Sequence, residues 1–194
     1  MSANVNVTNP SEKKKVLIVA ANPATSTVTQ WPVGFWWAEL THPYWTFTEA
    51  GYEVEIRSPD GGALQADAPS DPEDESGYSA DDLLSLGCKN WRRHRALIED
   101  TKSIDDVSPA HYDAVFFVGG QSPMFTFRGN EKVRRLLAAF YDAGKVTAVV
   151  CHATCLLLET KLGSGELLVK GKTWTGFANA EERIADDIVG RRLQ

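Results

Sequence analysis

A cysteine and a histidine stand together where an apolar run ends. The stretch AVVCHATCLLLE, residues 148–159, passes from small and β-branched residues into a helical pattern, with Cys151 and His152 at the junction. A thiol at the start of a helix lies near unpaired backbone N–H groups and the positive end of the macrodipole, which favour its thiolate. A sharp strand-to-helix turn also lifts the side chain above the sheet, as in a nucleophile elbow. Cys151 is therefore a candidate nucleophile; the alternative is an inert, buried thiol.

Two neighbouring features would complete such a site. His152 can act as a general base if a carboxylate orients its ring; otherwise it is a residue without a role near the start of the helix. Gly119 and Gly120 end another apolar run, and glycine lets a backbone approach a ligand closely. The N–H groups of Gly120 and His152 can together form an oxyanion hole, although a Gly-Gly pair also suits an ordinary turn.

Three further side chains carry possible chemistry. Glu39 lies within an aromatic segment, residues 35–45, and is either a surface residue or a buried carboxyl with a shifted pKa. From the sequence alone the surface interpretation is favoured. Cys155 follows Cys151 by one helical turn and fits the core better than the role of a resolving thiol. Cys88 has no assignable role.

Strands must carry these residues to one edge. Continuous apolar runs of this kind are typical of strands buried on both faces of a parallel sheet. They alternate with helical patterns, which indicates an α/β fold with sites at the carboxyl ends of the strands. We expect strands at residues 15–21, 112–120 and 145–151, one with an alternating pattern at 52–59, and a short fifth one at 172–177.

The helices are predicted from caps and periodicity. One should begin at Thr41 or His42, with Pro43 in its first turn, and end at Gly51. A second should run to about residue 100 with Trp91 and Leu97 facing inward. The segment 131–144 has apolar residues at helical spacing, and 152–163 and 179–194 are also expected to be helical. Residues 60–82 are poor in apolar residues and read as a long loop, with 63–82 as a lid or rim.

Composition excludes several classes of protein. The chain has 194 residues, 43% of them hydrophobic, and a formal net charge of -6 without a long basic run, which argues against nucleic-acid binding. No apolar stretch is long enough to span a bilayer, and the N-terminus lacks the apolar core of a secretory signal. We expect a flexible tail over residues 1–13 and a single domain over 14–194. Three unpaired cysteines suggest a reducing compartment, and no zinc pattern is present.

Together these segments resemble the ThiJ/PfpI superfamily, which has the class I glutamine-amidotransferase-like fold. The resemblance covers roughly residues 14–182, and the E-x-x-H-P and T-G-F…E elements are similar to the glyoxalase III and holding-chaperone branch. It implies a flavodoxin-like parallel sheet sandwiched by helices, a cytoplasmic homodimer and no cofactor. The segments that carry it are KVLIVAAN, GFWWAELTHPYWTFTEAGYEVEIRSPDGG, YDAVFFVGG, VTAVVCHA and GKTWTGFANAEE.

The resemblance also implies roles for individual residues. Cys151 matches the nucleophile, His152 the adjacent triad histidine, and Glu182 the carboxylate that orients it, with Glu181 as the alternative in register. Glu39 matches the acid that hydrogen-bonds the sulfur and handles protons. The oxyanion-hole amides match Gly120 and His152.

The chain departs from the branch at several points. The sequence GGQSP replaces Gly-Gly-His-Gly, so that Gln121 stands for a histidine; we place Gly119 and Gln121 at the substrate. Ala153 and Thr154 replace a common Gly-Pro. Family members usually continue beyond the equivalent of Gln194, so we expect this chain to lack the usual C-terminal end.

The implied function is a cofactor-independent lyase that converts methylglyoxal or a similar 2-oxoaldehyde to a 2-hydroxy acid through a cysteine hemithioacetal. Protein deglycation would use the same first step. The alternatives are hydrolysis or hydration of a small amide or isocyanide at the same thiol, or a redox sensor or holding chaperone. In the chaperone alternative, aromatic surface near Trp31–Trp37 would bind unfolded clients.

Overall fold

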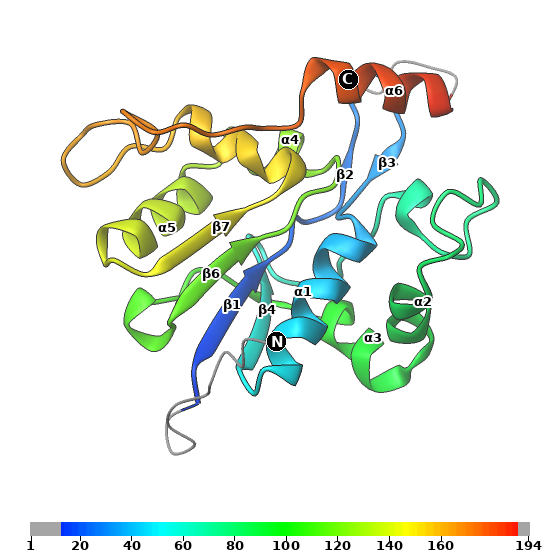
Figure 1. Ribbon diagram of the computed structural model, residues 1–194, viewed down its shortest axis with the longest axis horizontal. Helices are drawn as coiled ribbons and strands as arrows, with labels where there is room; N and C mark the ends of the chain where they lie inside the picture. The colour runs from blue at the N-terminus through cyan, green and yellow to red at the C-terminus, as the bar shows by residue number, and fades with distance from the viewer. Residues whose placement is uncertain (1–12, 190–194) are drawn as a thin grey trace, which may run out of the picture.

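A parallel sheet forms the centre of the computed structural model, which describes residues 13–189. Its strands lie in the order β5-β4-β1-β6-β7, and every neighbouring pair is parallel (Figure 1). Helices lie on both sides of this sheet, as expected for an α/β fold. The strands are β1 (Lys15–Val19), β4 (Glu53–Ser58), β5 (Lys102–Ser103), β6 (Ala114–Phe117) and β7 (Val146–Val149).

Two hydrophobic clusters fill the two sides of the sheet. Alternate side chains of β1 divide between them: Leu17 and Val19 belong to one cluster, Val16 and Ile18 to the other. The first cluster includes residues of α5 (Glu131–Asp142) and of the 3₁₀-helix η3 (Cys151–Leu158). The second includes residues of α1 (Trp37–Glu49). Because both faces are covered, β1 reads as a continuous apolar run.

Four of the five predicted strands are confirmed, and their carboxyl ends point to one edge of the sheet (Figure 1). The prediction of a strand at residues 172–177 is wrong. Those residues form an irregular segment that leads to α6 (Asn179–Val189). Within the described residues the segment has no strand partner.

The first helix begins earlier than its sequence suggests. We expected a start at Thr41 or His42, but α1 begins at Trp37 and contains Pro43 in its interior. The Trp37 N–H donates to the hydroxyl of Ser70, at 3.1 Å, so the helix is capped by a side chain from a distant segment. No local pattern could show that cap.

The second predicted helix is two helices. They are α2 (Leu83–Asn90) and α3 (Arg92–Glu99), separated by Trp91 in an extended conformation. The break turns Trp91 outward, where it is 57% exposed, so the prediction that it faces inward is wrong. Its ring packs edge-on against His94, with the centroids 4.7 Å apart. Leu97 is partly buried, as predicted.

The remaining helices follow the predicted ranges with one change of type. In α5 the side chains at helical spacing are buried as expected: Val133, Leu136, Leu137 and Phe140. The segment after Cys151 is a 3₁₀-helix that ends at Leu158, shorter and tighter than the predicted helix. The helix predicted over 179–194 appears as α6, and residues 190–194 lie outside the described part of the chain. So do residues 1–12 of the predicted tail. Within residues 13–189 no helix combines the length and apolar character that crossing a membrane requires.

Residues 60–82 form the predicted long connection, with only the short 3₁₀-helix η1 (Ala68–Ser70) inside it. Its second half, around residues 73–80, is mostly exposed, in agreement with a rim. Its first half differs from the prediction, because Asp67 and Ser70 are buried. This half runs beside the segment before α1: Phe35 donates its N–H to Gln65 and accepts that of Asp67. A small hairpin of β2 (Ala24–Thr25) and β3 (Pro32–Val33) leads into that segment.

The cluster under α5 should carry much of the stability. Leu137→Ala removes a side chain that is 1% exposed, so we expect the free energy of unfolding to fall by about 2–5 kcal/mol. Leu83→Ala makes the same change at a side chain that is 72% exposed and should cost about 0.5 kcal/mol or less. Urea unfolding of both variants measures the difference; equal losses would contradict this assignment of the core.

Candidate active site

Cys151 occupies a strained turn at the carboxyl end of β7. Its φ is 52°, in the left-handed region that residues other than glycine rarely adopt. The preceding residue, Val150, is extended, so the chain reverses abruptly between strand and η3. The Thr154 hydroxyl donates to the carbonyl of Cys151 at 2.5 Å and secures the turn. Such strain concentrates at functional positions, and the geometry is that of the predicted nucleophile elbow.

The sulfur of Cys151 faces four groups at once. The Glu39 carboxyl of α1 is hydrogen-bonded to it. The backbone N–H groups of Gly120, after β6, and of His152, in η3, donate to it. The Nδ1 atom of the His152 ring lies 3.2 Å from Sγ. The structure thus brings together Cys151, His152, Glu39 and Gly120, which the sequence marked separately.

The His152 ring is held on two sides. Its Nε2 atom lies 2.6 Å from Oε1 of Glu182 in α6, and its ring packs against Phe177 with centroids 4.4 Å apart. The imidazole is only 5% exposed. A carboxylate at Nε2 leaves Nδ1 free to accept a proton from the thiol, so the three side chains are arranged as a Cys-His-Glu triad.

Glu181, the acid next to Glu182, contacts the backbone at the start of α6. Glu181 is exposed, and its carboxylate accepts the N–H of Ala178 at 2.6 Å. This contact satisfies a backbone donor at the start of α6, as the acidic residue of a capping box does. Of the two registers left open by the sequence, the structure places Glu182 against His152 and Glu181 at the helix cap.

The electrostatics of the thiol differ from the expectation for a helix N-terminus. Burial and the charge on Glu39 raise the pKa of Cys151 to about 12, although the N–H groups of Gly120 and His152 act in the opposite direction. Burial also raises the pKa of Glu39. A protonated Glu39 removes the repulsion and can donate to the sulfur. The two groups are therefore suited to share one negative charge rather than to carry two.

Three consecutive amides leave the end of β6 in different directions. The Gly119 N–H donates to Oε2 of Glu39 at 2.9 Å, and that of Gly120 donates to the Cys151 sulfur. The Gln121 N–H donates to Oδ2 of Asp67 at 2.6 Å. Each of the three N–H groups thus binds a different acidic side chain. Gly119, Gly120 and Gln121 therefore form the wall of the site, which we call the amide wall.

Side chains would not fit within the amide wall. A Cβ at Gly119 would lie 2.4 Å from Oε2 of Glu39 and 2.5 Å from Cβ of Cys151. A Cβ at Gly120, where φ is 98°, would lie 2.5 Å from the carbonyl oxygen of Gly34. Close approach, which was one of two readings of the Gly-Gly pair, is therefore what the structure requires here.

Asp67 is a neighbour of the site that the sequence did not single out. It is 3% exposed, and burial raises its pKa to about 7. Besides Gln121 it accepts the N–H of Gly34 at 2.8 Å. Asp67 lies in a loop with many acidic residues, and its neighbours in sequence gave no signal that separates it from them.

The other two cysteines do not share the arrangement around Cys151. Cys155 is 6% exposed and donates to the carbonyl of Pro123 at 3.5 Å, and burial raises its pKa to about 12. Cys88 is also a buried free thiol in α2. Among the residues whose side chains are described, 13–186, no three His, Cys, Asp or Glu side chains converge as metal ligands would.

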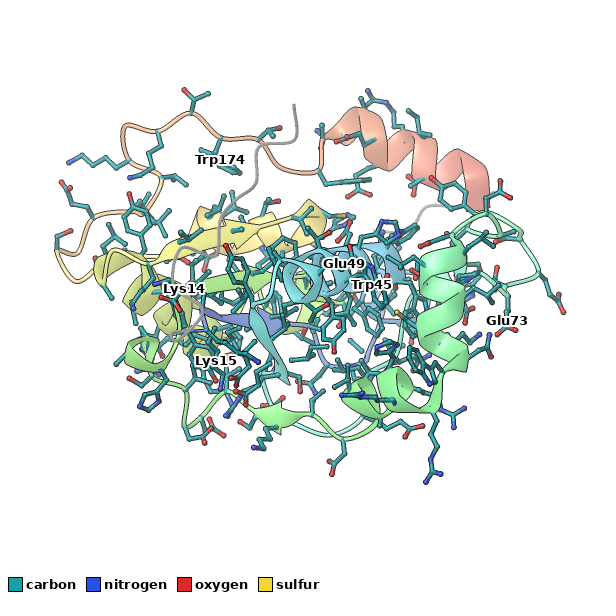
Figure 2. All side chains as sticks on the ribbon, turned by 60° about the horizontal axis from the view of Figure 1, so that its bottom comes forward. Lys14, Lys15, Trp45, Glu49, Glu73 and Trp174 are labelled. Carbon is teal, nitrogen blue, oxygen red and sulfur yellow. The ribbon has the colours of Figure 1, made fainter. Side chains whose placement is uncertain are left out.

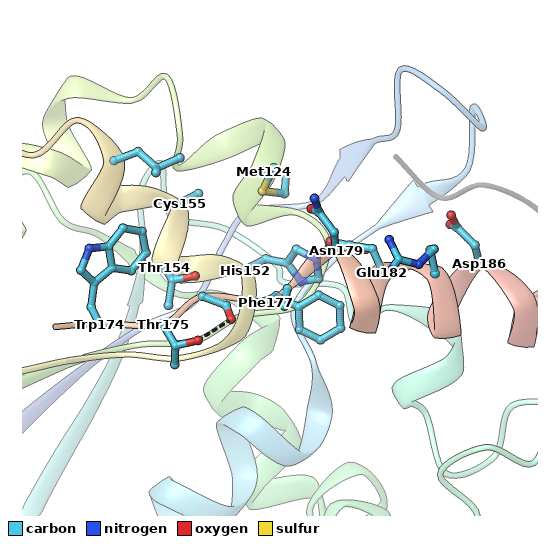
Figure 3. Close-up of a pocket in the computed structure, with 14 residues that line it drawn as sticks. Met124, His152, Thr154, Cys155, Trp174, Thr175, Phe177, Asn179, Glu182 and Asp186 are labelled. Atoms are coloured by element: carbon cyan, nitrogen blue, oxygen red, sulfur yellow. Dashed lines mark hydrogen bonds and ion pairs between the residues drawn. The ribbon is translucent and has the colours of Figure 1, made fainter.

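An open pocket of about 820 Å³ lies beside the triad, between η3 and α6 (Figure 3). His152, Glu182 and Phe177 line it, as does Trp174 at its other end. Cys151 is not among the lining residues, so the pocket meets the triad through His152 and Glu182. Trp174 is 42% exposed and lies on the outer segment that leads to α6 (Figure 2).

A family comparison matches this geometry. Residues 33–191 fit the model of the DJ-1/PfpI family, a span that contains Glu39, Cys151, His152 and Glu182. The chain belongs to the DJ-1/PfpI family. This agrees with the resemblance to the ThiJ/PfpI superfamily found in the sequence.

Two fungal relatives of this DJ-1/PfpI protein carry functional names. It is 28% identical over 180 residues to Schizosaccharomyces pombe hsp3103, named as a probable glutathione-independent glyoxalase; the match covers 79% of this chain and 66% of that protein. It is 27% identical over 160 residues to glyoxalase 3 of Candida albicans, with 81% of this chain and 64% of that protein covered. The chain thus spans about two thirds of the length of these curated relatives.

Solved structures show the same fold. Glyoxalase III of Candida albicans superposes with a TM-score of 0.72 at 26% identity, covering 91% of this chain and 74% of that one. The rapid encystment protein REP24 of Francisella tularensis gives a TM-score of 0.78 at 26% identity, covering 93% and 78%.

The two adjacent acids of α6 provide a matched test of the triad. In Glu182→Gln an amide N–H₂ can face Nε2, which places the ring proton on Nδ1 and prevents it from accepting the thiol proton. We expect iodoacetamide to alkylate Cys151 roughly 10²-fold more slowly. Glu181→Gln retains an acceptor for the Ala178 N–H and should change the rate by less than about twofold. Peptide mass spectrometry measures both rates, and equal effects would contradict the assignment of Glu182.

Proposed function

We propose that this DJ-1/PfpI protein is a cofactor-independent glyoxalase that converts methylglyoxal, or a related 2-oxoaldehyde, and water to a 2-hydroxy acid. The observation that carries the proposal is the surroundings of Cys151, whose sulfur contacts a general base, a buried carboxyl and two N–H donors. The names of the fungal relatives support it. In this proposal Cys151 is the nucleophile, and His152, Glu39 and Glu182 complete the catalytic set.

The first step makes a carbon–sulfur bond. Nδ1 of His152 accepts the thiol proton, and the charge on the ring is stabilised by Glu182 at Nε2. The sulfur attacks the aldehyde carbon, whose carbonyl π electrons move to oxygen. The N–H groups of Gly120 and His152 that point at the sulfur are placed to stabilise this oxyanion. Protonation of the oxygen by His152 gives the hemithioacetal.

The second step moves a hydrogen between two carbons. Glu39, as carboxylate, removes the proton from the carbon bonded to sulfur, and the electron pair forms the carbon–carbon double bond of an enediolate as the carbonyl π electrons move to the ketone oxygen. That oxygen takes the proton of the first hydroxyl. Glu39 then returns its proton to the second carbon as the first oxygen becomes the carbonyl of a thioester. Burial raises the pKa of Glu39, which makes it a stronger base for this transfer. Water then cleaves the thioester, releasing the 2-hydroxy acid and the thiol.

The same first step suits related substrates. A relative named protein/nucleic acid deglycase 2, from Escherichia coli, is 32% identical over 81 residues, 42% of this chain. Attack of Cys151 on a carbonyl adduct of a protein would begin deglycation in the same way. We further propose that the protein is cytoplasmic and forms a homodimer; size-exclusion chromatography with light scattering tests the oligomeric state.

The holding-chaperone alternative has less support. It required exposed aromatic surface near Trp31–Trp37, but Phe35 is 0% and Trp37 6% exposed. Both rings belong to the cluster under α1. Trp31 is 36% exposed and Trp36 is partly buried, so the segment presents little exposed aromatic surface.

Replacement of the thiols tests the proposal directly. Cys151→Ser removes the thiol that forms the hemithioacetal, so methylglyoxal consumption and 2-hydroxy acid formation should fall by at least about 10³-fold. Cys155→Ser, four residues away in the same 3₁₀-helix, should retain turnover within about threefold if it folds. Chromatography of the product follows both reactions. Absence of turnover in the wild type would remove the glyoxalase proposal, and turnover of a small amide instead would favour the hydrolase.

Substitution of Glu39 should change thiol reactivity and turnover in opposite directions. In Glu39→Gln the charge that raises the pKa of Cys151 is gone, so the thiolate forms at lower pH and alkylation at pH 7 should become faster. Methylglyoxal turnover should nevertheless fall by roughly 10²-fold or more, because the amide cannot carry a proton between carbons. Thermal unfolding provides the control for folding. Unchanged turnover in a folded variant would leave His152 as the remaining base.

A further inference from the structure

The amide wall is anchored from outside the triad. Gly119 is fixed by Glu39 and Gly120 faces the sulfur, but the far end of the wall, the N–H of Gln121, is bound by Asp67. The second oxygen of Asp67 accepts the N–H of Gly34, so one carboxylate joins two loops. Both of its oxygens are used, and the residue is 3% exposed.

Gly34 and Gly120 are in contact. The Gly34 carbonyl oxygen lies so near Gly120 that a Cβ there would be 2.5 Å away, and the same carbonyl accepts the N–H of Ser122 at 3.0 Å. A Cβ at Gly34 would itself lie 1.8 Å from the carbonyl oxygen of Gln65. Movement of Gly34 therefore shifts the peptide that carries the Gly120 N–H.

We propose that Asp67 is a positioning residue of the Cys151 site, whose two carboxylate oxygens hold Gly34 and Gln121 so that the Gly120 N–H stays aimed at the sulfur and at the oxyanion formed beside it. Asp67 touches neither the sulfur nor the reacting carbons, and acts only through the amide wall. The catalytic part of this inference rests on the proposed glyoxalase activity, whereas its effect on the thiol does not.

The segment that carries Asp67 is built to hold it still. Its own N–H donates to Phe35 at 2.8 Å, and its carbonyl accepts the hydroxyl of Ser70 at 2.7 Å. Ser70 in turn caps α1, the helix that carries Glu39. The first half of the predicted rim thus connects both acids of the site.

Asp67→Asn tests the proposal with little change of shape. The amide has one acceptor where the carboxylate has two, so its N–H₂ must face the N–H of either Gly34 or Gln121. A hydrogen bond to a charged group is stronger than one between neutral groups, so a misdirected Gly120 N–H should slow alkylation of Cys151 about tenfold or more. For methylglyoxal, kcat should fall by about 10- to 10²-fold with KM changed by less than about threefold.

The alkylation rate of Cys155 distinguishes a positioning role of Asp67 from a general loss of stability. It is buried in the same 3₁₀-helix, so a destabilised variant would alkylate Cys155 faster, whereas the proposal requires slower Cys151 and unchanged Cys155. Asp74→Asn is the matched control, because Asp74 belongs to the same loop and accepts only within its own turn, from Ser76. It should leave both rates unchanged.

The outcomes separate the two proposals. If the wild type does not turn over methylglyoxal, the glyoxalase proposal fails and the alkylation rates still decide the role of Asp67. Unchanged Cys151 alkylation in a folded Asp67→Asn protein, or parallel acceleration at both thiols, overturns the positioning role. If the variant does not fold, hydrogen exchange on the wild type decides: the amides of Gly34 and Gln121 should be protected like those of β6, and exchange as fast as that of exposed Gly129 would overturn the proposal.

Discussion

Three successive backbone N–H groups at the end of β6 fix the positions of the other groups of the site. Each is bound by a different acceptor: the Glu39 carboxylate, the Cys151 sulfur and the Asp67 carboxylate. Because consecutive peptides have few degrees of freedom, these contacts fix one another. The positions of α1, η3 and the loop around Asp67 are thereby tied to a single short turn.

Such an arrangement requires unusual proximity of backbones. The absence of side chains at Gly119 and Gly120 lets Glu39, Cys151 and Gly34 approach within distances that a Cβ would prevent. The left-handed turn at Cys151 then directs the sulfur back toward the wall. Residues held in this region cost about 1–3 kcal/mol, which the surrounding contacts must offset.

Burial influences the ionisation of the acidic groups in the site as much as their hydrogen-bond partners do. Glu39 and Asp67 both lie near the thiol, and burial raises the pKa of each carboxyl and of Cys151. Full ionisation of all three would place several negative charges in a poorly solvated space. Protons shared among these groups avoid that state, and backbone N–H groups supply the compensating dipoles. A site of this kind is suited to move protons between a thiol, a carboxyl and a bound carbonyl compound.

The sequence by itself determined four of the five strands of the sheet, all but the short edge strand β5, together with the inward face of α5 and the candidate residues at the strand ends. These features are local, because apolar runs and helical periodicity record burial along one segment. The sequence also shows that Cys151 and His152 are adjacent and that Glu182 follows them. The choice of Glu182 over Glu181 required the orientation of α6.

Only the tertiary structure decided the start of α1, the break at Trp91, the loop at residues 172–177 and the burial of Asp67. Ser70 caps α1 from another segment, and within the described part of the chain no strand pairs with residues 172–177. Asp67 looks like any acid of a polar loop until Gly34 and Gln121 are brought to it. The pKa of Cys151 also depends on the tertiary structure. The start of a helix favours the thiolate, but burial and the charge of Glu39 from α1 outweigh that effect and raise the pKa. Local patterns record which residues avoid water, whereas hydrogen bonds between distant segments and the desolvation of charge exist only once the chain has folded.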